Sequence, residues 1–164
     1  NKLRDLEQSS RKRERRIVSS MEESMHEIRE LKDDLYAIIP LLQVLNPNNE
    51  RGLLEARLKT MLEFGYRCVG YYIDGKLVGI CGFWILCKYY VGKHVEPDNM
   101  VFYPEYRGSG YGGRLIEWLL SLAKSEGCIA SELNCYLPND SGQRFWEKHG
   151  FRKIAHHYQS NFSV

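Results

Sequence analysis

The sequence contains no apolar run that approaches the roughly 18 residues needed to span a membrane, so we expect no membrane partner. It also has no internal repeat, no low-complexity segment and no sign of a secretory signal. Its five cysteines are odd in number and include no Cys-x-x-Cys pair, which argues against a disulfide framework and a zinc site. No other group of residues suggests a metal site, so we expect no metal. These absences favour a protein of the reducing cytoplasm.

Net charge is also low, at +2 over 164 residues, and the positive excess lies at the start of the chain. Residues 1–20 carry seven basic and three acidic side chains. Only residues 11–16 could support a nucleic-acid role, and we favour a solvated tail or helix face for them. We therefore expect no nucleic-acid partner. We expect residues 1–24 to form a basic extension and residues 25–164 to form a single domain.

The first part of this domain is ambiguous between strand and helix. Residues 25–29 predict a weak strand, but apolar side chains at helical spacing from Met21 to Leu35 leave one continuous helix open. Asp33 is a suitable N-cap for a helix that runs to Leu45. Pro40 should kink that helix.

Clearer patterns follow. Residues 50–64 predict a helix with one apolar face. Residues 68–73 and 77–90 predict two strands joined by a hairpin at Asp74-Gly75. An amphipathic helix ending at Gly127 comes later, and the rest of the chain reads as strand, short helix and strand. We expect an α+β fold with a mostly antiparallel sheet flanked by helices.

The segment at residues 104–113 links a strand-like stretch to that amphipathic helix. Four of the six residues from Gly108 to Gly113 are glycine, which is too many for a turn alone. Glycines let a backbone approach a ligand, and the N-terminus of a helix favours an anion. The segment therefore predicts a phosphate-bearing cofactor.

Two families of cofactor fit the glycines. Gly108, Gly110 and Gly113 satisfy the dinucleotide fingerprint, and Glu132 lies where a ribose-binding acid is expected. However, a dinucleotide fold places this turn after its first strand and needs several further strand–helix units. Too little chain follows Gly113 for that arrangement, so we rank this interpretation low.

The other interpretation is a resemblance to the GNAT acetyltransferase superfamily. Residues 107–112 match its acyl-CoA loop, which reads Arg or Gln, two residues, Gly, one residue, Gly or Ala. Residues 100–106 are similar to the family's fourth strand, and residues 133–139 to its fifth strand. Residues 145–151 are similar to its closing helix and Gly-Phe exit. The resemblance implies a mixed sheet of about six or seven strands, splayed apart between strands 4 and 5.

The resemblance also implies an activity, the direct transfer of an acetyl group from acetyl-CoA to a primary amine without an acyl-enzyme. A non-catalytic acyl-CoA-binding domain is the alternative. The positions implied for the cofactor are Met100, Val101 and Phe102 on the fourth strand, Arg107, Gly108, Ser109, Gly110, Tyr111, Gly112 and Gly113 in the loop, and Asn139. Asn139 is equally well placed as a helix N-cap.

For the general base we favour Glu96, with Asp98 in reserve on the same side of the strand. We expect a carboxylate near an apolar acyl group to have a raised pKa. His94 could act instead, although a histidine among polar neighbours is usually solvated. Trp146 replaces the family's proton-donating tyrosine, and an indole N–H cannot act as a general acid.

Tyr136 or Ser141 could protonate the leaving thiolate in its place; otherwise the thiolate leaves unprotonated. The acceptor amine stays open between a small molecule and a peptide. The oligomeric state is also open, with a homodimer among the alternatives.

Overall fold

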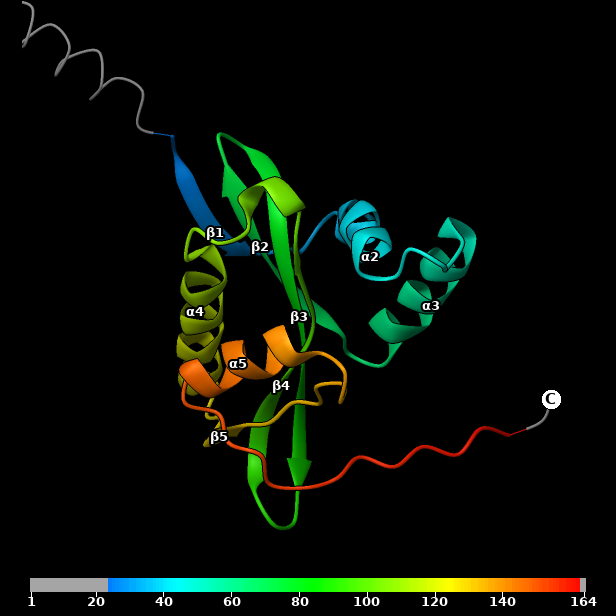
Figure 1. Cartoon of the computed structure of the whole chain (residues 1–164), viewed down its shortest axis with the longest axis vertical. Helices are drawn as coiled ribbons and strands as arrows, with labels where there is room; N and C mark the ends of the chain where they lie inside the picture. Colours follow the sequence, from blue (N-terminus) through cyan, green and yellow to red (C-terminus); the bar gives the residue numbers. More distant parts are fainter. Residues whose placement is uncertain (1–23, 163–164) are drawn as a thin grey trace, which may run out of the picture.

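The computed structural model describes residues 24–162, so the expected basic extension at residues 1–24 lies almost wholly outside the described residues. Within residues 24–162, five strands form one sheet in the order β1-β2-β3-β4-β5 (Figure 1). They are β1 (His26–Glu30), β2 (Arg67–Ile73), β3 (Lys76–Lys88), β4 (Gly92–Phe102) and β5 (Ala130–Ser131). The first four pair antiparallel, and β5 runs parallel to β4.

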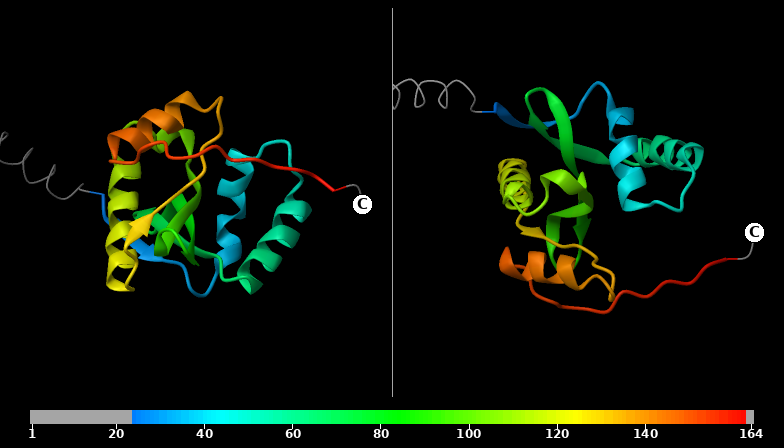
Figure 2. Two further views of the ribbon diagram at one scale, coloured as in Figure 1. Left: turned by 90° about the horizontal axis from the view of Figure 1, so that it is seen from below. Right: turned by 45° about the horizontal axis from the view of Figure 1, so that its top comes forward.

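Helices cover both faces of the sheet (Figure 2). They are α2 (Ile39–Leu45), α3 (Arg51–Glu63), α4 (Tyr111–Ser125) and α5 (Asp140–Lys148), with short 3-10 helices η1 (Leu35–Ile38) and η2 (Pro104–Tyr106). One core packs α2 and α3 on the face that carries Ile80 and Val101. The other packs α4, with Phe145 and Trp146 of α5, on the face that carries Val95. The expected α+β class is confirmed.

The ambiguous start of the domain is a strand. His26–Glu30 pairs with β2, with Arg29 opposite Gly70, so the continuous-helix alternative is wrong over these residues. The predicted cap at Asp33 is also wrong, because the 3-10 helix begins after Asp34, whose side chain makes no capping bond. Pro40 lies in the first turn of α2 and does not kink it. A proline is tolerated there, since the N–H that it lacks would have no helical partner.

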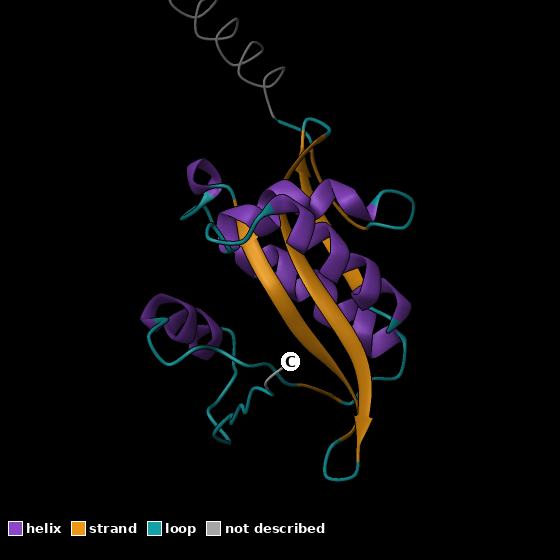
Figure 3. Ribbon diagram, turned by 90° about the vertical axis from the view of Figure 1, so that its right-hand side faces the viewer, coloured by secondary structure: helices purple, strands orange, loops and turns teal. Residues whose placement is uncertain are grey.

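The predicted hairpin between β2 and β3 is confirmed. Asp74 and Gly75 have φ values of 49° and 78°, as a two-residue type I′ turn requires. The next hairpin joins β3 to β4, the two longest strands, which cross the molecule side by side (Figure 3). Beyond Val95, residues 96–102 of β4 pair with β3 alone.

The expected count of six or seven strands is wrong, since the described residues form five. The predicted fifth strand at residues 133–139 is irregular, and pairing with β4 is limited to Ala130 and Ser131. The predicted last strand is also absent, because residues 152–162 are exposed and form no ladder. An extended segment becomes a strand only where a neighbour accepts its backbone hydrogen bonds, and both segments diverge from the sheet.

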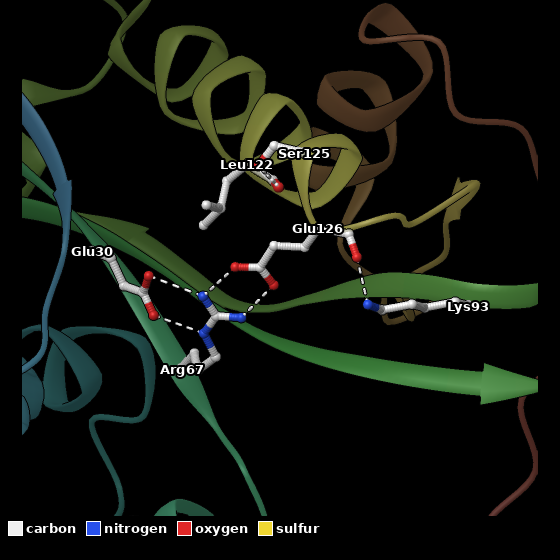
Figure 4. A network of polar contacts seen from close by, with 6 residues as sticks. All are labelled: Glu30, Arg67, Lys93, Leu122, Ser125 and Glu126. Atoms are coloured by element: carbon white, nitrogen blue, oxygen red, sulfur yellow. Dashed lines mark hydrogen bonds and ion pairs between the residues drawn. The ribbon is translucent and has the colours of Figure 1, made fainter.

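A cluster of ion pairs joins three elements where β1 ends and β2 begins (Figure 4). Arg67 of β2 makes two hydrogen bonds to Glu30 of β1 and two to Glu126 just after α4, at 2.7 to 3.0 Å. Its guanidinium also lies over the ring of Phe83. Lys93 donates to the backbone carbonyl of Glu126. The C-terminal end of α4 is thereby tied to the sheet.

Among residues 24–162, no helix is both long enough and apolar enough to cross a bilayer.

Candidate active site

The glycine-rich loop leaves β4, passes through η2 and enters α4. Gly108 and Gly110 have φ values of 77° and 81°, in the left-handed region that favours glycine. No described residue accepts a hydrogen bond from the backbone N–H groups of Gly108, Ser109 or Gly110. The N–H groups of Tyr111, Gly112 and Gly113 follow in the first turn of α4, which has no side-chain cap. The loop is thus a cradle of backbone donors suited to an anion.

The glycines of this loop serve two purposes. A Cβ on Gly108 or Gly110 would meet nothing within 4 Å, so these two are required by their backbone angles. A Cβ on Gly112 would lie 3.1 Å from Cε of Met100, and one on Gly113 would lie 2.7 Å from Nε2 of His149. Gly112 and Gly113 therefore allow α4 to pack closely against β4 and α5.

This context excludes the dinucleotide interpretation. The loop follows the fourth strand of a sheet whose first four strands are antiparallel. A dinucleotide fold requires the turn after the first strand of a parallel sheet. Glu132, the candidate ribose-binding acid, lies instead beside β4, where its N–H donates to the carbonyl of Val95.

The hydrogen bond from Glu132 to Val95 is the last backbone bond between β4 and the chain beyond β5. The ladder pairs His94 with Ala130 and Val95 with Ser131, and then the two segments diverge. We call this divergence the fork; its two arms are residues 96–102 of β4 and residues 132–139. The expected splay between the fourth and fifth strands is therefore present, although the second arm is irregular chain.

The β4 arm contains a bulge. Gly82 pairs with Asp98 and Ile80 with Val101, so β4 carries one extra residue at Asn99–Met100, where Asn99 has a φ of 53°. Tyr103 donates its N–H to the carbonyl of Val78 in β3. Because successive N–H groups of a strand point to opposite sides, the N–H of Val101 also faces β3, whereas that of Phe102 faces the open edge. Arg107 closes the arm by donating Nε–H to the carbonyl of Phe102 at 3.0 Å.

The other arm ends at Asn139. Its side-chain Oδ1 accepts a hydrogen bond from the N–H of Gly142 at 3.0 Å, so Asn139 is the N-cap of α5. Ser141 donates its hydroxyl to the same oxygen at 3.2 Å. The N-cap role is confirmed, and the remaining donor group of Asn139 stays on the exposed surface of the second arm.

A pocket of about 250 Å³ lies at the fork. Its lining is Trp84, Glu96, Pro97, Asp98 and Asn134. Both arms contribute, since Asn134 comes from the second arm and the two acids from β4. The structure thus places Glu96 and Asp98 in one pocket, as expected for residues on the same side of a strand. Trp84 of β3 donates its indole N–H to Oδ2 of Asp98 at 3.1 Å.

Glu96 belongs to a compact polar cluster. Its Oε1 lies 2.5 Å from Nζ of Lys88 and 3.0 Å from Nε2 of His94. Oε2 of Glu132 lies 3.6 Å from Lys88 and 3.8 Å from His94, and it accepts the hydroxyl of Tyr90. We call these five residues the fork cluster.

The environment of Glu96 overturns the expected direction of its pKa. Burial alone would raise the pKa of Glu96, but the hydrogen bonds from Lys88 and His94 outweigh it and lower the pKa below its ordinary value. Glu96 is thus held as an anion, and the expectation of a raised pKa is wrong. Asp98 is exposed and receives a hydrogen bond from Trp84.

His94, Glu96 and Glu132 place one nitrogen and two oxygens within 4.8 Å of one another, close enough for a metal ion. The ammonium of Lys88 already contacts both carboxylates and supplies positive charge. We therefore assign an ion-pair cluster here and not a metal centre.

Sequence reasoning missed most of this cluster. His94 was expected to be solvated, but it is fully buried. Lys88 and Glu132 were given no role near Glu96, because they reach it from β3 and from beyond β5. One local signal was available, since His94 and Glu96 lie two residues apart and therefore face the same side of a strand.

Trp146 and the two suggested proton donors, Tyr136 and Ser141, lie apart from this pocket. Trp146 packs against Phe145 and Phe151 on the α4 side of the sheet. The Tyr136 side chain is largely exposed, and the Ser141 hydroxyl is bonded to Asn139. Neither Tyr136 nor Ser141 is among the residues that line the pocket.

Solved structures share this fold. The aminoglycoside N-acetyltransferase AAC(6')-Iy in complex with CoA matches with a TM-score of 0.74 and 18% identity, over 86% of this chain and 97% of its own. The ribosomal-protein-alanine N-acetyltransferase from Brucella melitensis biovar Abortus 2308 matches with a TM-score of 0.72 and 21% identity, over 85% and 100%. At these identities the likeness shows the fold. A search of curated protein sequences found no match.

Glucosamine-6-phosphate N-acetyltransferase from Arabidopsis thaliana is a further match, with a TM-score of 0.64 and 22% identity, over 85% of this chain and 99% of its own. Residues 26–151, well over half of the chain, match the family model described as acetyltransferase (GNAT) family. The chain therefore belongs to the GNAT acetyltransferase family.

Proposed function

We propose that this protein is an N-acetyltransferase that moves an acetyl group from acetyl-CoA directly to a primary amine. The observation that carries the proposal is the pocket at the fork, which has carboxylates on one arm and an amide on the other. It lies on the strand that leads into the glycine cradle. Two of the matched enzymes are named for amine substrates, an aminoglycoside and glucosamine-6-phosphate, which supports an amine acceptor.

The residues present suit coenzyme A. The free N–H groups from Gly108 to Gly113 would hold its diphosphate, and Arg107 lies beside them. The open edge of β4, with the N–H of Phe102 and the bulge at Met100, would hold its pantetheine arm. Asn139, on the second arm of the fork, would contact the pantetheine chain from the other side. Acetyl-CoA supplies an acyl group activated as a thioester.

Asp98 is the better candidate for the general base. The acceptor arrives as an ammonium ion and must lose a proton before its nitrogen can attack. Trp84 occupies Oδ2 of Asp98, which fixes the carboxylate and leaves Oδ1 for the proton. Glu96 is less suited to proton transfer, because Lys88 and His94 stabilise its charged form. Its second oxygen, Oε2, would instead accept a hydrogen bond from the ammonium group of the acceptor, since Lys88 and His94 both contact Oε1.

Thiolate departure needs no side-chain acid in this scheme. A free cysteine thiol has a pKa of about 8.5, so a thiolate is a stable enough leaving group, and the sulfur would take its proton from water. Trp146 could not supply that proton. The backbone N–H groups at the open edge would stabilise the charge on the thioester oxygen.

The proposal is tested by incubating the protein with acetyl-CoA and a panel of amines while free thiol is measured. We expect thiol release that depends on both the protein and an amine. The panel should include small diamines, aminoglycosides, an amino sugar phosphate and peptides with free N-termini. Binding of CoA without thiol release on any of these amines would favour a non-catalytic acyl-CoA-binding domain, the alternative that Trp146 keeps open.

Gly110 offers a test of the cradle. Gly110→Ala would force an L-residue into the left-handed region at a cost of about 1–2 kcal/mol. If the loop relaxes to avoid this strain, we expect the Kd for CoA to rise by roughly 5- to 30-fold, measured by calorimetric titration.

Gly52→Ala is the matched control. Gly52 lies in α3, and a Cβ there would meet nothing within 4 Å. Alanine in a helix should be neutral or stabilising by about 0.5–1 kcal/mol, and CoA affinity should not change. Equal CoA affinity in the Gly110→Ala protein would place the cofactor elsewhere.

A further inference from the structure

The fully buried His94 has no part in the proposed reaction, yet it lies directly behind the acceptor pocket. Its Nδ1 is 2.9 Å from the carbonyl oxygen of Gly92. A carbonyl can only accept, so Nδ1 carries a proton. This bond fixes the ring orientation and turns Nε2 toward Glu96 and Glu132.

The protonation state of Nε2 follows from its neighbours. Glu96 places Oε1 at 3.0 Å and Glu132 places Oε2 at 3.8 Å from this nitrogen. A bare lone pair would repel both carboxylates, whereas an N–H donates to Glu96 and attracts Glu132. The other groups of the fork cluster are Lys88 of β3, which is cationic, and Tyr90 of the β3–β4 turn, which is neutral.

The charge of the cluster supports the same state. With an imidazolium at His94, two positive charges face two negative ones. With a neutral ring, the partly buried cluster would hold an uncompensated negative charge, which costs more than a paired one. A ring that donates from both nitrogens therefore satisfies both contacts of His94 and balances the charge of the cluster.

His94 lies close to the point where the two arms of the fork separate. It pairs with Ala130, the first of the two pairs of the β4–β5 ladder, one residue before the arms separate. Glu96 belongs to one arm of the fork, and Glu132 begins the other. The imidazolium thus binds carboxylates from both arms at the point where they separate, and one of these carboxylates lines the pocket.

We propose that His94 is a positioning residue that fixes the carboxylate of Glu96 in the acceptor pocket and the separation of the two arms. It acts through Glu96 and Glu132 and does not touch the acceptor. The assignment rests on the proposed acetyl transfer. Removing the imidazole of His94 should therefore weaken acceptor binding more than it slows the chemical step.

The kinetic test compares His94→Leu with His94→Gln. Leucine removes both hydrogen bonds, and we expect the KM for the amine to rise about tenfold or more while kcat changes less than threefold. A glutamine amide can still donate to Glu96, so His94→Gln should recover a large part of the loss. His156→Leu, at an exposed histidine of the C-terminal segment, is the matched control. A KM within twofold of wild type in His94→Leu would overturn the proposal, as would equal losses in kcat, CoA affinity and melting temperature.

A second readout does not depend on activity. Nitrogen-15 NMR of histidine-labelled wild-type protein at neutral pH should show one imidazolium with both nitrogens protonated. That signal should change in the Glu96→Gln protein and persist in Glu147→Gln, a control at an exposed acid. A neutral ring in the wild type would overturn the inference even if acetylation is found. An imidazolium without any acetylation would leave the cluster intact and remove the proposed reaction instead.

Discussion

Asp98→Asn is expected to lower kcat for acetyl transfer by about 10²- to 10⁴-fold, the usual contribution of a general base. Asparagine keeps the size of the side chain and can still accept the indole hydrogen bond of Trp84, so the pocket should keep its shape. What is lost is the ability to take a proton from the ammonium. The measurement is steady-state thiol release with the best amine of the panel, and CoA affinity should be unchanged.

Two comparisons make this result specific. Asp33→Asn removes an exposed acid far along the chain from the pocket, and we expect no effect on kcat. Glu96→Gln should raise the KM for a cationic amine more than it lowers kcat, because Glu96 is assigned to bind the ammonium group and not to take its proton. If Glu96→Gln abolishes turnover while Asp98→Asn retains it, the two carboxylates have been assigned the wrong way round.

Arg67→Met should lower the free energy of unfolding by about 2–4 kcal/mol. Removing one partner of a buried ion pair typically costs roughly 3–5 kcal/mol, and partial exposure reduces that figure here. The guanidinium binds two carboxylates, whose side chains are 14% and 31% exposed for Glu30 and Glu126. Methionine preserves the contact with Phe83 but leaves both acids without their cation. Urea denaturation followed by circular dichroism measures the change.

Arg51→Met is the control for this prediction. Arg51 pairs with Glu55 on the exposed face of α3, with side chains 61% and 40% exposed. Such a surface pair contributes about 0.3–0.5 kcal/mol. Similar losses in the two variants would mean that the Arg67 cluster is no more than a surface pair.

The same cluster makes stability depend on pH. Hydrogen bonds from Arg67 lower the pKa of Glu126 in the folded protein. A carboxyl with a depressed folded pKa contributes its full stabilisation above the unfolded value, about 4.5, and loses it as the pH falls through the folded value. Wild-type stability should therefore decline below about pH 4.5, and part of that decline should disappear in Arg67→Met. An unchanged pH profile in the variant would contradict this cause.

Local sequence signals predicted what local physics decides. Asp74-Gly75 specified its hairpin because two successive residues had to adopt positive φ. Gly108 and Gly110 specified the loop for the same reason, and the apolar spacing of residues 50–64 specified α3 within one residue at each end. The expected splay was recognised through resemblance of residues 100–106 and 133–139 to known motifs, not from periodicity.

The failures concern interactions between distant parts of the chain. Residues 133–139 and 152–162 have extended character, but whether a strand forms depends on a neighbour, and none is there. The pKa of Glu96 depends on Lys88, eight residues away across a hairpin. The burial of His94 depends on packing from β5. No window of sequence around these residues contains that information.

The two-residue contact of β5 with β4 has a kinetic consequence. Beyond it, no ladder joins the arms of the fork, so a donor lying along the open edge of β4 would act as an additional strand between them. The acceptor pocket would then acquire its final shape only after the donor has entered. For the proposed acetyl transfer we therefore expect acetyl-CoA to bind before the amine, and product inhibition patterns should display that sequence.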